Sequence, residues 1–215
     1  MTEFALRARA DGLRLLLVRH GQTPSNVRGA LDTLPPGPGL TDEGSQQAEA
    51  LAGRLADEKV LSIHASRALR AQQTARPLAD RHGLDVEVAD GTHEIHVGEL
   101  EGNADAASRQ RFDEVYAGWH LGSPDVPMPG GETGEQALAR FFGSAQPLLE
   151  DVLTGSVVLV SHGAMIRLVA GRLAPEVDGE RANAAYLPNT GLIALEADSS
   201  SPTGWRCTQW DDLPA

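Results

Sequence analysis

The sequence predicts a single α/β domain in which a mostly parallel central sheet is flanked by helices on both faces. Two short apolar runs, residues 13–18 and 156–161, are typical of strands buried on both faces of a sheet. Strand patterns alternate with helix patterns along the chain, and this alternation favours parallel pairing. The chain has 215 residues, enough for one substantial core, since domains commonly contain roughly 100–200 residues.

The first strand is expected at residues 13–18 and ends at Arg19 and His20. A loop rich in proline and glycine follows it. Thr41 is then a suitable N-cap with two acidic residues in the first turn, and apolar residues continue at helical spacing up to Leu55. This pattern predicts an amphipathic helix.

The next segment repeats the alternation of strand and helix. Residues 60–65 predict the second strand, and Ser66 is expected to cap a helix that continues to about Arg81. Gly83 should end that helix, because glycine adopts the left-handed conformation found after many helices. Residues 84–88 again resemble a strand.

The second half of the chain carries the longest amphipathic pattern. Thr133 and Gln136 form a capping box at its start, which predicts a helix that packs on the core. The apolar strand at residues 156–161 stops at His162, and residues 164–173 predict another helix. Two further segments near the carboxyl end are strand-like and could add edge strands: residues 191–197 and 205–210.

The charge balance disfavours nucleic acid and anionic lipid as partners. Thirty acidic and eighteen basic residues give a formal net charge of −12, the wrong sign for binding such polyanions. Hydrophobic residues make up 41% and charged residues 22%, the composition of ordinary globular domains. Apolar runs in the sequence fall short of the roughly 20 residues that a membrane-spanning helix requires.

Cysteine usage indicates a reducing compartment. Cys207 is the single cysteine, so it can form neither an internal disulfide nor a zinc-type pair. The amino-terminal apolar run is too short for a secretory signal. We therefore expect a cytoplasmic protein that uses no cofactor and contacts neither nucleic acid nor membrane; a homo-oligomer is compatible with the sequence.

Two histidines stand where the most apolar strands end. His20 and His162 each follow a buried strand and each precede a glycine. In open α/β sheets, ligands bind outside the carboxyl ends of the strands. One histidine in this position is more often satisfied by hydrogen bonds within its loop, but two in the same context predict a binding or catalytic site.

Four segments around these histidines together resemble the histidine phosphatase superfamily, the phosphoglycerate-mutase-like proteins. The resemblance implies the fold of that family and its phosphatase branch. The segments occur in the family's order, with Pro129-Gly130-Gly131-Glu132 also similar, and cover most of the chain from residue 17 to 163. They are Arg19-His20-Gly21 after the first strand, the arginine helix at residues 66–75, the acid loop at residues 94–102, and Ser161-His162-Gly163.

The resemblance implies a metal-independent phosphomonoester hydrolase of the histidine acid type, acting on a small phosphorylated metabolite. His20 would attack phosphorus and form a phosphohistidine, which divides hydrolysis into two easier displacements. Arg19 and Arg70 would clamp the phosphoryl oxygens, because guanidinium groups stay charged and bind two oxygens each. His162 would donate a further hydrogen bond to the same oxygens.

Other positions of the family's pattern are assigned in the same way. Glu94 occupies the slot of the general acid, which protonates the leaving oxygen and then deprotonates the incoming water. Gly163 adds backbone N–H groups at a helix start. Three polar residues in the loop after the first histidine are expected to bind phosphate oxygens: Gln22, Thr23 and Asn26.

The chain also departs from the family's pattern. Arg67 stands where proline or aspartate is usual, and we expect it on the surface. Leu100 replaces a common tryptophan. The domain, residues 1–215, should contain an insertion at about 103–130 that covers the substrate. Three aromatic residues in the insertion either contact substrate or form the apolar stripe of a packed helix: Phe112, Tyr116 and Trp119.

Three alternatives compete with a phosphatase. A metal hydrolase is suggested by His93 and His96 on either side of Glu94, but the His-Glu-x-x-His spacing of zinc sites is absent and no third ligand is evident in the sequence. A cofactor-dependent phosphoglycerate mutase would share Arg19-His20-Gly21, but its usual acid loop and basic insertion differ from this sequence. A non-catalytic phosphate-binding module would need only the pocket.

Overall fold

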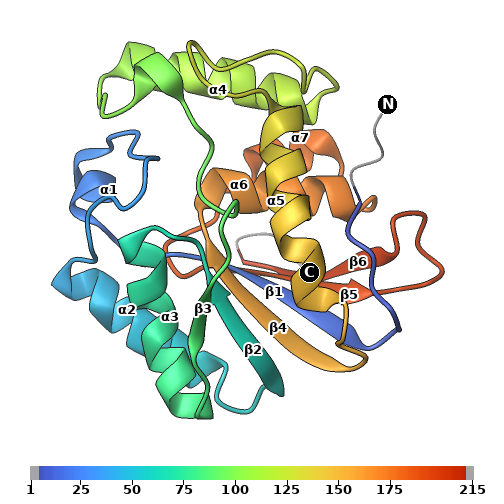
Figure 1. The fold of residues 1–215 in the computed structure, drawn as a ribbon. Helices are drawn as coiled ribbons and strands as arrows, with labels where there is room; N and C mark the ends of the chain where they lie inside the picture. Colours follow the sequence, from blue (N-terminus) through green and yellow to red (C-terminus); the bar gives the residue numbers. More distant parts are fainter. Residues whose placement is uncertain (1–4, 212–215) are drawn as a thin grey trace.

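The computed structural model describes residues 5–211, whose strands form one six-stranded sheet with the order β3-β2-β4-β1-β5-β6 (Figure 1). Neighbouring strands from β3 to β1 are parallel, whereas β5 pairs antiparallel with β1 and β6 pairs antiparallel with β5. The predicted, mostly parallel sheet is confirmed. The strands are β1 (Leu13–Arg19), β2 (Val60–Ala65), β3 (Val86–Val88), β4 (Gly155–Ser161), β5 (Leu192–Ala197) and β6 (Trp205–Trp210).

Helices cover both faces of the sheet (Figure 1), as expected for an α/β domain. Alternate residues of β1 point to opposite sides: Leu16 and Val18 join one apolar core, while Leu15 and Leu17 join the other. The first core packs under α2 (Asp42–Arg54) and α3 (Leu69–His82). The second packs under α5 (Gly134–Leu149) and α6 (Gly163–Leu173), and α4 (Ala106–His120) and α7 (Gly179–Ala184) also contribute residues to it.

The predicted helix starts and stops are largely confirmed. Thr41 caps α2 by accepting a hydrogen bond from the Gly44 N–H at 3.0 Å. Thr133 and Gln136 form the expected capping box of α5. Gly83 ends α3 with a φ of 67°, the left-handed conformation that favours glycine.

Three boundary predictions were wrong. Ser66 is not the N-cap of α3, which begins at Leu69 after the N-cap residue Ala68. The Ser66 hydroxyl accepts the Ala68 N–H at 3.3 Å and bonds the His162 ring at 2.8 Å. The strand predicted at 84–88 shrinks to β3. The segment predicted at 191–197 is a strand as expected but does not lie at the edge, since β5 is between β1 and β6 and is almost entirely buried. The segment predicted at 205–210 is β6, which does form an edge of the sheet.

The insertion predicted at 103–130 contains α4. Tyr116 and Trp119 are buried, so these two residues form part of a packed helix face, and Phe112 is half-buried beside them. The rings of Phe112 and Tyr116 stack with centroids 5.4 Å apart. Sequence patterns gave no explicit prediction for α7 or for the short α1 (Pro24–Arg28), because each has fewer than two helical turns.

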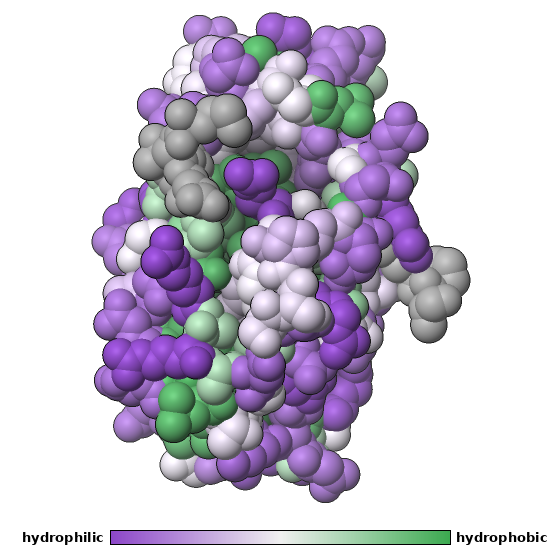
Figure 2. All heavy atoms as spheres, turned by 90° about the vertical axis from the view of Figure 1, so that its right-hand side faces the viewer, coloured by the Kyte–Doolittle hydropathy of each residue, from purple (hydrophilic) through white to green (hydrophobic). Residues whose placement is uncertain are grey.

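The surface agrees with the composition. Figure 2 shows the side of the molecule that lies to the right in Figure 1, where hydrophilic residues dominate and apolar residues are visible between them as a narrow, interrupted band. None of the described helices is long and apolar enough to cross a membrane.

Candidate active site

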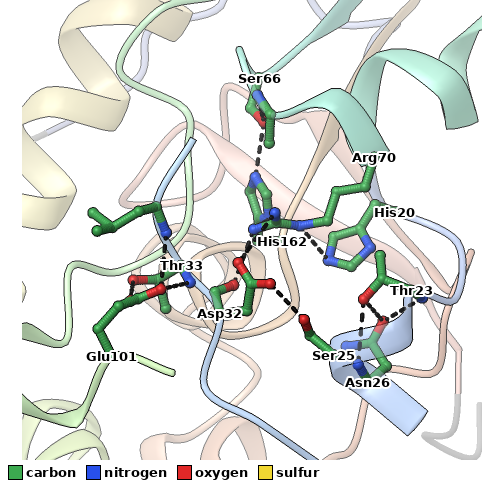
Figure 3. A network of polar contacts seen from close by, with 12 residues as sticks. His20, Thr23, Ser25, Asn26, Asp32, Thr33, Ser66, Arg70, Glu101 and His162 are labelled. Atoms are coloured by element: carbon green, nitrogen blue, oxygen red, sulfur yellow. Dashed lines mark hydrogen bonds and ion pairs between the residues drawn. The ribbon is translucent and has the colours of Figure 1, made fainter. Parts of the chain in front are cut away.

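The two strand-end histidines lie side by side (Figure 3). Arg19 pairs in register with Ser161, so His20 and His162 leave adjacent strands at the same edge of the sheet, with ring centroids 5.1 Å apart. Arg70, from the first turn of α3, reaches both rings. These three residues are called the floor of the site, and they are nearly inaccessible: 5% of His20, 1% of Arg70 and 0% of His162 is exposed.

The hydrogen bonds of His20 define its tautomer. Nδ1 lies 2.7 Å from the Gly21 carbonyl oxygen, which can only accept, so Nδ1 carries the proton. Nε2 therefore keeps its lone pair, and it accepts from Arg70 Nε at 3.2 Å. Burial, followed by the charges of Arg70 and Arg19, lowers the pKa of His20 well below its usual value. The ring is a neutral imidazole with an available nucleophilic nitrogen.

His162 has the opposite tautomer. Arg70 Nη2 lies 3.3 Å from Nδ1 and can only donate, so Nδ1 accepts. The proton is then on Nε2, which donates to the Ser66 hydroxyl at 2.8 Å. Burial and the charge of Arg70 lower the pKa of His162 well below its usual value. In this arrangement His162 orients Arg70 rather than presenting an N–H group to the pocket.

Arg70 connects the floor to the loop before α2. Its Nη2 also donates to the main-chain oxygen of Asp32 at 3.1 Å, and its Nη1 lies 3.7 Å from the Asp32 carboxylate. Burial lowers the pKa of Arg70, and Asp32 is the strongest of the charges that raise it again. Gly37 leaves room for this side chain, because a Cβ there would collide with Nη1 and the φ of 61° is itself unfavourable for other residues.

Arg19 lies at the side of the floor. Its Nη1 donates to the Leu187 carbonyl at 2.6 Å and to the Tyr186 hydroxyl at 3.1 Å. Its guanidinium carbon lies 5.5 Å from the centroid of the Tyr186 ring, a cation–π distance. These contacts engage Nη1 of the guanidinium group, whereas its Nε forms no hydrogen bond with the residues that the structure describes.

Glu94 is placed at the start of α6. Its carboxylate accepts the backbone N–H groups of Ala164 at 3.1 Å and Met165 at 2.9 Å, and that of Ile95 at 3.0 Å. Because His162 is the N-cap residue of the same helix, Glu94 is anchored next to the floor.

Arg140 holds the loop that carries Glu94. It donates to the main-chain oxygens of Gly91, His93 and Glu94 at 2.7, 2.8 and 2.9 Å, and it forms a two-pronged ion pair with Glu132 at 2.7 and 3.0 Å. Each of these hydrogen bonds from the guanidinium group thus goes either to the loop that carries Glu94 or to the Glu132 carboxylate. Arg140 and Glu132 together fix the main chain from which Glu94 projects.

A pocket of about 190 Å³ opens above the floor. Six of the nine residues predicted to form the site line it directly, and Arg70 lies immediately behind its wall. Those that line it are His20, His162, Arg19, Glu94, Asn26 and Gly163.

The structure does not bring Gln22 and Thr23 to the pocket. Thr23 is buried and caps α1, where its hydroxyl and main chain exchange hydrogen bonds with Asn26. Gln22 accepts instead from the Thr41 hydroxyl at 2.9 Å. Asn26 lines the pocket, but its Oδ1 already accepts from Thr23 and from the side chain of Asn189.

The pocket also contains Asp32, Arg167 and Tyr186, which were not predicted as site residues. Phe112, one of the three aromatic residues expected either to contact substrate or to pack, lines it as well. Arg167 could have been found, since it follows Gly163 by four residues and therefore lies on the same face of α6. Asp32 and Tyr186 lie in loops, where periodicity gives no signal.

The structure bears on the position of Arg67 and on the metal site suggested by His93 and His96. Arg67 is exposed and lies 3.5 Å from Asp90, which confirms the expected surface position. Within the described residues, no group of three or more His, Cys, Asp or Glu side chains is arranged to hold a metal ion. His93 and His96 thus lack a third ligand there.

Comparison with known proteins relates this chain to the histidine phosphatases. A family model of the histidine phosphatase superfamily (branch 1) matches residues 15–212. Glucosyl-3-phosphoglycerate phosphatase of Mycolicibacterium vanbaalenii is 31% identical over 92% of this chain and 94% of its own length. The metal-independent phosphoserine phosphatase of Arabidopsis thaliana is 25% identical over 97% of this chain and 85% of its own.

Other relatives differ in length or are known as structures. A PE-PGRS family protein of Mycobacterium tuberculosis, PE_PGRS11, is 33% identical over 92% of this chain, but the chain spans only 36% of that protein. The solved structure of a mycobacterial glucosyl-3-phosphoglycerate phosphatase complexed with VO3 has a TM-score of 0.78 and 27% identity. That match covers 93% of this chain and 99% of the other.

Proposed function

The chain belongs to the histidine phosphatase superfamily (branch 1), and on this premise we propose that it is a metal-independent phosphomonoesterase that forms a phosphohistidine at His20. The substrate would be a small phosphorylated metabolite, a class to which the substrates in the names of two relatives belong. The segment at 103–130 supplies Phe112 to the pocket lining, which supports its proposed role as a cover.

The observation that carries this proposal concerns the two clamp arginines. Arg70 Nη1 and Arg19 Nε are both buried, and neither atom has a hydrogen-bond partner within residues 5–211. Buried N–H groups are nearly always paired, so unpaired ones at a site indicate a ligand with acceptor oxygens. A phosphoryl group would satisfy both, because its three equatorial oxygens carry the negative charge of the transition state.

In the first step, the lone pair of His20 Nε2 attacks phosphorus and the bond from phosphorus to the ester oxygen breaks. Glu94 gives its proton to that oxygen, and the neutral alcohol leaves. Arg70 turns from His20 to the phosphoryl oxygens, because its Nε contacts the nitrogen that becomes phosphorylated. His162 then loses the donor at Nδ1 and can itself donate to an oxygen once its proton moves to that nitrogen.

In the second step, water attacks phosphorus and the bond to His20 Nε2 breaks. The Glu94 carboxylate accepts the proton of the water, which restores the acid for the next cycle. Inorganic phosphate leaves with the free imidazole regenerated. The Gly21 carbonyl holds the His20 ring by its Nδ1 proton through both steps.

Hydrolysis of p-nitrophenyl phosphate tests this proposal. The wild-type protein should release phosphate in a strong chelator and without added bisphosphoglycerate, which separates it from a metal enzyme and from a mutase. Intact mass of the base-quenched reaction should show one added phosphoryl group that His20→Ala abolishes, because the bond between phosphorus and an imidazole nitrogen survives base but not acid. His82→Ala is the matched control, because His82 bonds the Leu55 carbonyl at the far end of α3. Equal rates for wild type and His20→Ala would overturn the proposal.

A further inference from the structure

A carboxylate lines the pocket that is proposed to hold an anion. Asp32 Oδ1 lies 3.7 Å from Arg70 Nη1 (Figure 3), and about a fifth of the Asp32 side chain is exposed. The proposed function gives this residue no task. A negative charge so close to a phosphoryl group opposes binding by Coulomb repulsion, so its presence in the lining calls for a second function.

Asp32 is held firmly in this position. The hydroxyl of Ser25, itself only 2% exposed, donates to Oδ2 at 2.5 Å. The main-chain oxygen of Asp32 accepts from Arg70 Nη2 at 3.1 Å. Ser25 of α1 therefore fixes one carboxylate oxygen of Asp32, and Arg70 of the floor fixes its main chain. The other carboxylate oxygen, Oδ1, forms no hydrogen bond with any residue in 5–211, and its contact with Arg70 Nη1 is an ion pair at 3.7 Å.

The residues on either side of Asp32 are tied to the end of the acid loop. The Leu31 N–H donates to the Asn103 carbonyl at 2.9 Å, and the Gly102 N–H donates to the Leu31 carbonyl at 2.7 Å. The Thr33 N–H donates to the Glu101 carboxylate at 2.9 Å. Asp32 is thus held between the floor and the loop that carries the proposed acid, which is where a leaving group would pass.

Resting on the proposed function, we propose that Asp32 is a specificity-determining residue that recognises a hydrogen-bond donor on the leaving group. When Arg70 Nη1 binds a phosphoryl oxygen, Asp32 Oδ1 accepts from a hydroxyl or ammonium group near the ester oxygen. Phosphomonoesters of polyols and amino alcohols are accepted, whereas a second carboxylate or phosphate in that position is repelled. The fixed carboxylate needs no rearrangement to do this, which limits the entropy lost on binding.

Three two-carbon esters that differ only in their terminal group test the proposal. O-Phosphoethanolamine carries an ammonium group, 2-hydroxyethyl phosphate a hydroxyl group and phosphoglycolate a carboxylate. For each, kcat/KM is measured with wild type, Asp32→Asn and the control Asp80→Asn, which removes one charge from an exposed position on α3. The kcat/KM of each variant is divided by that of wild type for the same ester. This division cancels the intrinsic reactivity of the ester, so the resulting values can be compared between esters.

We expect Asp32→Asn to lower the ratio of kcat/KM for phosphoethanolamine to that for phosphoglycolate by about tenfold or more at low ionic strength. Asp80→Asn should leave the ratio within about twofold of wild type. Ser25→Ala keeps the charge but releases it, and should lower the ratio by a smaller factor; it replaces Asp32→Asn if circular dichroism shows that the latter is unfolded.

The possible failures are distinguishable. If wild type hydrolyses p-nitrophenyl phosphate but the ratio is the same in wild type and the folded Asp32 or Ser25 variant, the role of Asp32 is overturned and the proposed function stands. If wild type hydrolyses neither p-nitrophenyl phosphate nor any of the three two-carbon esters, the proposed function fails and this inference falls with it. If it hydrolyses p-nitrophenyl phosphate but none of the three, recognition of their terminal groups by Asp32 is overturned and the proposed function stands.

Discussion

The floor of the pocket and its rim are built in different ways. The floor consists of His20, Arg70 and His162, which come from two strand ends and one helix start and are at most 5% exposed. We define the rim as Phe112 and Tyr186, which come from α4 and from the segment after α7. Tyr186 is 61% exposed, and Phe112 is half-buried.

We expect the difference to separate the chemical step from the selection of substrate. In the floor, each ring nitrogen has a specified partner, and burial keeps both imidazoles neutral. In the rim, Tyr186 is held through its contacts with Arg19, and its ring is open to solvent. We expect changes in the floor to alter the rate of the reaction for every substrate, and changes in the rim to alter the choice of substrate.

Removing the central cation should have the largest effect. Arg70→Met should lower kcat/KM by at least about 10³-fold for every ester, because it removes the proposed buried donor to the transition state and a partner of both histidines. Arg70→Lys should restore little, since an ammonium cannot contact both rings and the phosphoryl group together. Arg67→Met is the control: three residues earlier and exposed, it should behave as wild type in the same steady-state assay.

Loosening the acid loop should come next. Arg140→Met leaves Glu132 without its ion-pair partner and should lower the free energy of unfolding in urea by about 3 kcal/mol. It should also copy Glu94→Gln by lowering kcat about 100-fold for alkyl phosphates and far less for p-nitrophenyl phosphate, whose leaving group needs little protonation.

The exposed Arg111→Met is the matched control for Arg140, because Arg111 only faces Glu114 on the surface of α4 at 3.5 Å. Equal losses with alkyl and p-nitrophenyl esters would show that Arg140 supports the fold but does not position the acid.

The floor should also make stability depend on pH. His20 and His162 have pKa values lowered chiefly by burial, well below 6.5, and burial lowers the pKa of His93 and His120 to about 4. The unfolded chain therefore binds more protons below pH 6.5, so stability is full above that pH and is lost as the pH falls toward 4.

Thermal unfolding between pH 7.5 and 4.5 measures this loss. His162→Gln should flatten the decline in Tm by a few °C, because the variant has no imidazole to keep neutral at this position. Phe112→Leu, a change in the rim, should preserve the slope of wild type. A slope unchanged by His162→Gln would contradict the assignment of a buried neutral ring.

The smallest effect is expected at the rim. Tyr186→Ala should raise KM about fivefold for esters whose leaving group carries a ring, with kcat nearly unchanged, because an exposed aromatic contact is worth about 1 kcal/mol. Tyr186→Phe keeps the ring and should stay within about twofold of wild type. A large fall in kcat for Tyr186→Ala would mean that its contact with Arg19 belongs to the chemistry of the floor.

The sequence by itself determined that the two histidines lie at the carboxyl edge of the sheet. Apolar runs specified the buried strands, and residues directly after such strands must emerge at the carboxyl edge of a parallel sheet, which located His20 and His162. Arg70 followed from its place in the family's pattern. These positions are local, because each lies within or directly after an element with a strong hydrophobic pattern.

Tertiary structure alone decided the rest of the pocket. Ser66 was expected to cap a helix but bonds a ring 96 residues away, and the loop of Asp32 is fixed by Glu101 across 68 residues. Gln22 and Thr23 are close to His20 in sequence, yet Gln22 bonds Thr41 and Thr23 caps α1. Loop side chains have no period to specify their direction, so the long-range hydrogen bonds that satisfy them in the folded chain decide which ones face the substrate.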